Sequence, residues 1–232
     1  LKHVAPGSVG KKIRHRINDL ADTFLTDNML KSPVNVPVET REKYLNNFTR
    51  NQIRLATLNS GIMKPDSLDE YMLLGGFGAL KKSLMSGDPG GIIDTITKSG
   101  LRGRGGAGFL TGRKWSISAG TRGRPKYVVC NGDEGDPGAF MDRMLLESFP
   151  YRIIEGMMIA AYATGASEGI FYIRAEYPLA VTRVGHALRH CYEKGYLGKN
   201  ILGSDFSFDA RIFEGAGAFV CGEESALIAS LE

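Results

Sequence analysis

The stretch KYVVCN, residues 126–131, is a compact apolar run that opens a pattern of alternating strands and helices. Two similar runs, GIFYIRAE at 169–176 and ARIFEGAGAFV at 210–220, predict further strands, the last of them bent or divided in two. Helical spacing fills the intervals, with breaks at Pro150 and Pro178. This order of strands and helices predicts an α/β fold, in which a parallel sheet is flanked by helices.

The residues before Pro125 carry no comparable alternation. Residues 1–40 are expected to form a basic arm and connector, with a short helix near 11–26. Residues 41–98 are expected to form a helical lead-in segment, and residues 99–232 the α/β domain. The helical spacing of the lead-in runs from 40 to 86, with clear helical stretches at 40–61 and 65–76, and a further short helix is expected at 90–100.

Composition narrows the class of protein. With 232 residues, 43% of them apolar, the chain can bury a substantial core. It has no apolar run near the roughly 20 residues of a membrane span and no signal peptide at its start, so a soluble, cytoplasmic protein is expected. Three cysteines without a C-x-x-C pair argue against a disulfide framework and against a complete cysteine-ligated metal site. No metal site is predicted.

The net charge of +4 comes from the N-terminal arm, since residues 1–60 hold ten Lys or Arg against five Asp or Glu. The stretch GKKIRHRI, residues 10–17, is compatible with a nucleic-acid patch or a transit peptide. Acidic residues follow it directly and no aromatic residues interleave it. A solvated helix face or a surface that docks on a partner subunit is therefore favoured, and no nucleic-acid partner is predicted.

The first candidate loop is SGLRGRGGAGF, residues 99–109, which fits G-x-G-x-x-G at Gly103, Gly105 and Gly108. A predicted helix precedes it and the nearest strand follows about twenty residues later, so it does not fit the phosphate loop of an ordinary Rossmann unit. Its glycines, basic residues and aromatic residues suit a cradle for a phosphorylated aromatic cofactor. A flexible basic loop between domains is the alternative.

The second loop, VCNGDEGDPGAFMDR at 129–143, follows the first strand at the edge where open α/β sheets bind ligands. Its polar residues are Asn131, Asp133, Glu134 and Asp136. Three interpretations remain open: a divalent-metal loop, although the spacing is not that of a calcium motif; recognition of polyol or ribose hydroxyls; or an acidic turn that caps the next helix, with Asp136 near its start.

The third loop, EGAGAFVCGEESALIASLE at 214–232, again runs from a strand through glycines into a helix. It lacks G-K-[ST], which argues against a P-loop ATPase. Glu223 and Glu224 fall in the first turn, where the helix dipole favours carboxylates. No histidine lies near Cys221 in sequence, so a buried structural thiol is predicted there rather than a nucleophile.

Five motifs in series now carry a resemblance: GLRGRGGAGFLTGRKW, NGDEGDPGAFMDR, YIRAEYPLA, GYLGKNILGSDFSFD and GAGAFVCGEESAL. From about residue 50 onward the chain resembles the flavin-bearing, NADH-oxidising subunit of respiratory complex I. It is also similar to the diaphorase subunits of NAD(P)-linked hydrogenases and formate dehydrogenases, and two of the motifs are closer to this branch. The resemblance implies a Rossmann-like FMN-binding domain preceded by a helical segment.

The family's pattern assigns site residues by position. The resemblance implies that the FMN phosphate and isoalloxazine contact Gly103, Arg104, Gly105 and Lys114. It implies that the ribityl chain and ring edge contact Asn131, Asp133 and Glu134, and that the site is closed by Gly222, Glu223 and Glu224. Residues implied to face the nicotinamide nucleotide are Gly106, Ala107, Phe109 and Asp136. Three positions depart from the common pattern: Ile117 and Phe219 replace aromatic and tyrosine residues, and Asp136 replaces a longer glutamate.

The resemblance implies hydride transfer from NADH or NADPH to FMN, followed by one-electron transfer to iron-sulfur subunits of a multisubunit complex. No side chain is assigned as a catalytic acid or base. A [4Fe-4S] cluster is expected in a C-terminal region that this sequence does not include, and no cysteine precedes Cys130 to ligate a [2Fe-2S] cluster. Glu223 and Glu224 are expected to disfavour an anionic reduced flavin. The alternatives are a non-catalytic flavin- or nucleotide-binding scaffold and a metal-dependent sugar or nucleotide enzyme.

Overall fold

The structure, a computed structural model, describes residues 51–231, and the chain divides after Pro65 into two compact units. The described part of the first unit, residues 51–65, consists of turns and coil. The helix predicted for residues 40–61 is therefore wrong over 51–61, where Asn59 and Gly61 adopt left-handed backbone conformations with φ of 69° and 77°. Consecutive helical hydrogen bonds cannot pass through such residues. The predicted arm and its helix near 11–26 lie outside the described residues.

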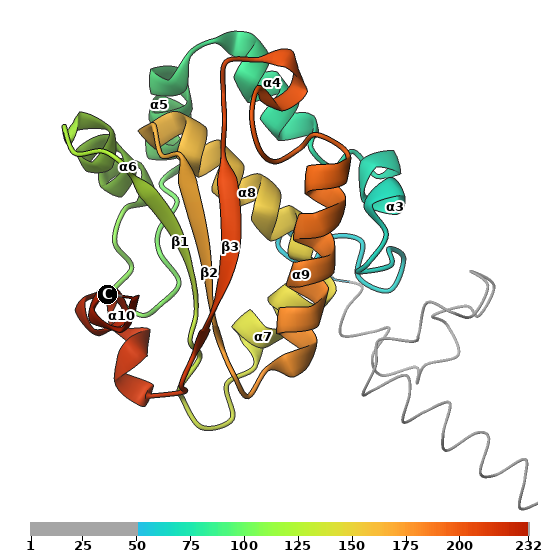
Figure 1. Cartoon of the computed structure of the whole chain (residues 1–232), viewed down its shortest axis with the longest axis vertical. Helices are drawn as coiled ribbons and strands as arrows, with labels where there is room; N and C mark the ends of the chain where they lie inside the picture. Colours follow the sequence, from blue (N-terminus) through green and yellow to red (C-terminus); the bar gives the residue numbers. More distant parts are fainter. Residues whose placement is uncertain (1–50, 232) are drawn as a thin grey trace, which may run out of the picture. The chain divides into compact units, whose positions relative to one another are not determined.

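The described part of the second unit is built on a parallel sheet of three strands in the order β1-β2-β3. The strands are β1 (Tyr127–Gly132), β2 (Glu168–Arg174) and β3 (Asp209–Gly215). Val129 pairs with Ile170, which in turn pairs with Arg211. Figure 1 shows the three strands side by side, with β2 in the middle. The predicted α/β fold is thus confirmed. The third strand, however, ends at Gly215 and does not continue to residue 220.

Helices form the crossovers that a parallel sheet requires. The chain passes from β1 to β2 through α7 (Met141–Ser148) and α8 (Pro150–Thr164), and from β2 to β3 through α9 (Pro178–Glu193) and the short 3-10 helix η3 (Ile201–Gly203). Pro150 and Pro178 each occupy a first helical turn, where proline's missing N–H has no helical partner to lose. The breaks predicted at these two prolines are confirmed.

The two faces of the sheet have different neighbours. Alternate residues of a strand point to opposite faces. On one face Gly169 approaches Met157 of α8 and Phe208 so closely that a Cβ at this position would lie 2.6 Å from the Phe208 ring. The core lies on this side, where Phe171 and Ile173 are fully buried against the crossover helices. Figure 1 shows α9 beside the β3 edge of the sheet and α6 and α10 beside the β1 edge.

Within residues 51–231, four helices precede the sheet: α3 (Leu68–Leu73), α4 (Gly78–Ser86), α5 (Pro89–Ser99) and α6 (Thr111–Gly120). A buried carboxylate on α8 holds the first two. Glu155 accepts hydrogen bonds from the Tyr71 hydroxyl, from the Phe77 N–H at 2.8 Å and from the Leu80 N–H at 3.1 Å. These donors satisfy a charge that would otherwise be costly to bury.

The pair α5 and α6 packs through a glycine. A Cβ at Gly112 would lie 2.7 Å from the Thr97 backbone, so only glycine permits this approach. The helical spacing in the sequence predicts α3 and α5 but not α6, which begins directly after the glycine-rich loop.

After β3, the 3-10 helix η4 (Phe219–Gly222) leads into α10 (Glu224–Leu231). This segment packs on the face of the sheet opposite α8: Tyr172 of β2, Cys221 and Leu227 form a buried cluster, and the Tyr172 hydroxyl lies 2.9 Å from the Ser230 hydroxyl. The prediction of a buried thiol at Cys221 is confirmed, since it is 6% exposed. Within residues 51–231, every helix is too short or too polar to cross a membrane.

Candidate functional site

The glycine-rich loop connects two helices, α5 and α6, and its ends are pinned together. The Gly103 N–H donates to the Phe109 carbonyl at 2.9 Å, and the Arg102 guanidinium donates to the Gly108 carbonyl at 2.9 Å. Gly106, with φ of 106°, adopts a conformation that favours glycine. Between these pins, the N–H groups of residues 104–109 donate to no acceptor among the described residues. The loop therefore presents a run of exposed backbone donors.

The loop faces a cavity of about 620 Å³, within the size range of small-molecule sites. The cavity lies between the loop, α6, β1, α8 and α10. Apolar side chains make up much of its wall, from Trp115, Tyr127, Val129, Leu227 and Ile228. Site residues proposed from the sequence that line it are Gly103, Gly105, Ala107, Phe109, Lys114, Asn131 and Glu224.

Charged side chains from two helices meet in the wall of this cavity. The Lys114 ammonium lies 3.1 Å from the Glu224 carboxylate, which joins α6 to the start of α10. Both side chains are more than half exposed, at 59% and 75%, so the pair is screened by water and free to exchange partners. Nearby, the Arg113 guanidinium lies 5.8 Å from the centre of the Phe109 ring, and that ring is 46% exposed.

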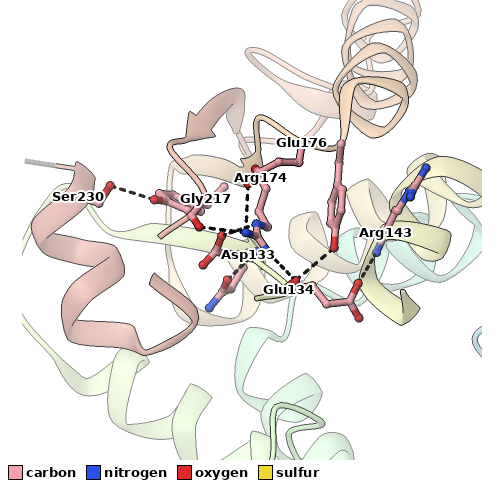
Figure 2. A network of polar contacts seen from close by, with 10 residues as sticks. Asp133, Glu134, Arg143, Arg174, Glu176, Gly217 and Ser230 are labelled. Atoms are coloured by element: carbon pink, nitrogen blue, oxygen red, sulfur yellow. Dashed lines mark hydrogen bonds and ion pairs between the residues drawn. The ribbon is translucent and has the colours of Figure 1, made fainter. Parts of the chain in front are cut away.

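The carboxylates of the second loop have different surroundings. The Glu134 carboxylate accepts the N–H groups of Asp142 at 3.1 Å and Arg143 at 3.2 Å, and so caps α7 (Figure 2). The capping alternative inferred from the sequence is thus met by Glu134, whereas Asp136 lies exposed in a turn. A single sequence cannot tell which of several neighbouring carboxylates reaches the helix.

Asp133 is the buried member of this loop. Its side chain is fully buried, and neither carboxylate oxygen accepts a hydrogen bond from the described residues. The nearest charge is the Arg174 guanidinium, with Nε 3.5 Å from Oδ1. Burial raises the pKa of the Asp133 carboxyl, while Arg174 opposes that rise.

In the third loop, Glu223 caps α10. Its carboxylate accepts the N–H groups of Ser225 at 3.0 Å and Ala226 at 3.2 Å, and these bonds lower the pKa of Glu223. Phe219 and Gly222 belong to η4, the turn just before this cap. The proposed site residues that lie outside the lining of the cavity are Arg104, Gly106, Asp133, Glu134, Asp136 and Glu223.

Neither Arg174 nor Lys126 was expected from the sequence as a site residue. Arg174 ends β2 and joins the second and third loops, as Figure 2 shows. Lys126 is buried and donates to the carbonyls of Ser118, Ala119 and Thr164, at the ends of α6 and α8. The only signal for either was its position at the end of a predicted strand.

Thiols and metal ligands offer no second site in the described part of the chain. No three His, Cys, Asp or Glu side chains within it are placed to hold a metal ion. The three cysteines are free, and burial raises the pKa of Cys130 and of Cys191 to about 12. Protonated, buried thiols are poor nucleophiles.

These features define a class. An α/β unit whose glycine-rich loop and strand ends surround an apolar-walled cavity is a cofactor-binding domain for a phosphorylated, ring-bearing ligand. A family model described as the Nuo51 FMN-binding domain matches residues 96–232. The chain belongs to this family.

Relatives and solved structures agree with this membership. The HndC subunit of the NADP-reducing hydrogenase of Solidesulfovibrio fructosivorans is 52% identical over 79% of this chain and 37% of the relative. A subunit of the NADH-quinone oxidoreductase of Aquifex aeolicus is 51% identical over 72% of this chain and 38% of the relative. The chain thus spans a little over a third of these relatives.

Among solved structures, the crystal structure of an NAD⁺-reducing [NiFe]-hydrogenase in the H₂-reduced state aligns with a TM-score of 0.53 and 40% identity. The alignment covers 62% of this chain and 24% of that chain. The resemblance carried by the five motifs is therefore confirmed at the level of the family.

Proposed function

We propose that this chain is part of an oxidoreductase subunit that oxidises NADH or NADPH by hydride transfer to bound FMN and passes electrons to iron-sulfur clusters of a partner. The observation that carries the proposal is the cavity itself. It combines unengaged backbone donors, one lysine and an apolar wall, in a chain of an FMN-binding family.

The phosphate of FMN fits the glycine-rich side of this cavity. Backbone N–H groups at residues 104–109 are exposed and have no acceptor among the described residues, and a Cβ at Gly105 would meet nothing within 4 Å. Such a loop suits close approach of an anion. Lys114 would add a point charge, since its ion pair with Glu224 is exposed and exchangeable.

The flat ring of FMN fits the opposite wall. Tyr127 and Val129, on the open face of β1, are 49% and 37% exposed, and Leu227 and Ile228 of α10 face the same cavity. Burying this surface against an aromatic ring would remove apolar area from water. Asn131 would offer an amide to the ring edge or ribityl hydroxyls.

The other proposed site residues act around these two ends. Phe109, exposed beside Arg113, would stack on the nicotinamide nucleotide, with Gly106, Ala107 and Asp136 near it. Glu224 would lie near the reacting ring, and Glu223, already bound to the start of α10, would hold that helix in place. When bound, FMN supplies the hydride acceptor, so the protein's task is to place two rings face to face.

The named relatives are subunits of larger redox enzymes. We therefore propose iron-sulfur subunits as partners, a [4Fe-4S] cluster in a region that these 232 residues do not include, and a cytoplasmic location. No side chain of the cavity is proposed to act as an acid or base.

An anaerobic titration tests the function. The protein is purified, incubated with FMN, freed of excess FMN by gel filtration and titrated with NADH or NADPH while the flavin absorbance band is followed. Stoichiometric bleaching is expected, and the nucleotide that bleaches at lower concentration identifies the preferred donor. A protein that retains FMN but is bleached by neither nucleotide would favour the scaffold alternative.

A matched variant ties the result to the cavity. Lys114→Ala removes the proposed phosphate contact, and Lys98→Ala removes a lysine on α5 that does not line the cavity. The first is expected to weaken FMN binding by about tenfold or more, as for loss of a charged hydrogen bond, and the second to leave it unchanged. Equal affinities in both variants would place the flavin elsewhere.

A further inference from the structure

We propose that Arg174 is a positioning residue, one guanidinium that holds the second and third loops in the arrangement that receives the flavin. The inference rests on the proposed FMN site but concerns a residue that does not line the cavity. It comes from a convergence of contacts that Figure 2 shows around this side chain.

The position of Arg174 allows it to reach both loops. It is the last residue of the central strand β2, and the second and third loops leave from β1 and β3 on either side. Its side chain is 17% exposed, so its donors are largely withdrawn from water and must be satisfied by protein groups.

Each arm of the guanidinium has its own partner. One terminal nitrogen, Nη1, donates to the Glu134 carbonyl of the second loop at 2.9 Å. The other, Nη2, donates to the Gly217 carbonyl of the third loop at 2.9 Å and to the Glu176 carboxylate at 3.1 Å. A single planar group therefore fixes the separation of two backbone segments that are 83 residues apart in the chain.

The third nitrogen, Nε, faces Asp133. It lies 3.5 Å from Oδ1, which gives an ion pair without a hydrogen bond, and neither Nε nor the two carboxylate oxygens has a hydrogen-bond partner in the described part of the chain. The arginine offsets part of the cost of burying this carboxylate without using up its lone pairs. Asp133 is therefore held beside Arg174 with both of its oxygens without a hydrogen-bond donor among the described residues.

Other contacts near the two carbonyl acceptors of Arg174 also restrict the backbone of the two loops. Gly217, with φ of 78°, turns the chain sharply between β3 and η4 in a conformation that favours glycine, and the Glu176 carboxylate lies against it. On the other loop, the Tyr177 hydroxyl also donates to the Glu134 carbonyl, at 3.2 Å. Lysine cannot replace the guanidinium, since one ammonium cannot span both carbonyls in the same plane.

The experiment measures both loops before any cofactor is added. Amide hydrogen exchange is followed in the full chain for peptides over 132–140 and 214–222, with a peptide of α9 as an internal reference. In Arg174→Ala, exchange is expected to rise by roughly tenfold or more in both loops, the factor for loss of a hydrogen bond to a charged group, and not in α9. Arg124→Ala is the matched control, because the Arg124 guanidinium donates to the Gly165 carbonyl at 2.6 Å and neither residue lies in either loop or in α9.

A chemical rescue separates positioning from general support. Guanidinium chloride, well below the concentration that unfolds the chain, is expected to restore slow exchange and FMN affinity in Arg174→Ala, whereas sodium chloride at the same ionic strength is not. Arg174→Lys is expected to protect one loop only. These variants keep the proposal testable if the alanine variant is poorly folded.

The outcomes are distinct. Unchanged exchange in Arg174→Ala, a rise in only one loop, or an equal rise in α9 would overturn the proposal. A rise in both loops with unaltered FMN affinity would also overturn it, since the loops would then be fastened for some other purpose. If the wild-type chain binds no FMN, the proposed function fails, and the exchange data still report whether Arg174 joins the loops.

Discussion

The two faces of the same three-stranded sheet are built for different purposes. On the face toward α8, Phe171 and Ile173 are fully buried. On the opposite face, Tyr127 and Val129 of β1 stay partly exposed over a cavity, while Tyr172 is sealed beneath α10. The comparison teaches that stability is concentrated on one face, and that the other keeps apolar surface free for a ligand.

The largest effect on stability is expected when one side chain on each face is shortened to alanine. Phe171→Ala, on the packed face, is expected to lower the free energy of unfolding by about 3–5 kcal/mol because it leaves a cavity. Val129→Ala, on the open face, is expected to cost less than about 1 kcal/mol, since this side chain is 37% exposed. Urea unfolding measures both. Similar losses in the two variants would show that the faces do not differ in this way.

The next test concerns the part of the second face that α10 covers, around Tyr172. A Cβ at Gly215 would lie 2.5 Å from the Tyr172 ring, beneath α10. Gly215→Ala is therefore expected to lower the free energy of unfolding by about 1–3 kcal/mol through overpacking. Gly156→Ala provides the control, since a Cβ at Gly156 would meet nothing within 4 Å. If Gly215→Ala is as stable as the control, α10 is not seated on the sheet as described.

A smaller effect is expected from the pH dependence of Asp133. Burial raises its pKa above the usual 3.8, so the folded state holds the proton more tightly than the unfolded state. Stability from this group is absent at neutral pH and grows as the pH falls through the raised pKa, reaching its full value below about 3.8. Asp133→Asn lacks this dependence.

Urea midpoints of wild type and Asp133→Asn, measured from neutral to acidic pH, give the difference directly. Wild type should gain on the variant as the pH falls. A difference that is constant with pH would show that Asp133 ionises as easily in the folded chain as in the unfolded one.

The smallest change in stability is expected in the wall of the cavity. The pair of Lys114 and Glu224 is exposed, so Glu224→Gln should alter the free energy of unfolding by less than about 1 kcal/mol. If its role lies with the reacting ring, the same variant should change the flavin reduction potential or the affinity for NADH. Unchanged values of both would remove Glu224 from the proposed site.

The sequence predicted those features that depend on local pattern. Apolar runs indicated the three strands, and Pro150 and Pro178 marked where α8 and α9 begin. The helix α6 was missed because it has no side-chain cap and starts at once after five glycines. The third strand was drawn too long, since Gly217 turns the chain there and its carbonyl binds an arginine from another strand.

The sequence predicted which loops form the candidate site, but not which task each of their side chains performs. Glu134 and Glu223 were expected at the cofactor, and the structure shows each of them capping a helix. Which carboxylate reaches a helix start and which is buried depends on contacts between strands. The position of Arg174 near the end of a predicted strand could not reveal its role, because its partners lie in loops that leave from neighbouring strands.

The carboxylate of Glu155 has a practical consequence for anyone who wishes to shorten this protein. Its hydrogen-bond donors within the described chain belong to residues 71–80, well before the glycine-rich loop. A fragment started at residue 99 would contain the whole sheet and all the proposed flavin contacts, yet it would lose all three donors of Glu155 and the helices α3, α4 and most of α5. We therefore expect a fragment that keeps the surroundings of Glu155 on α8 to begin before α3.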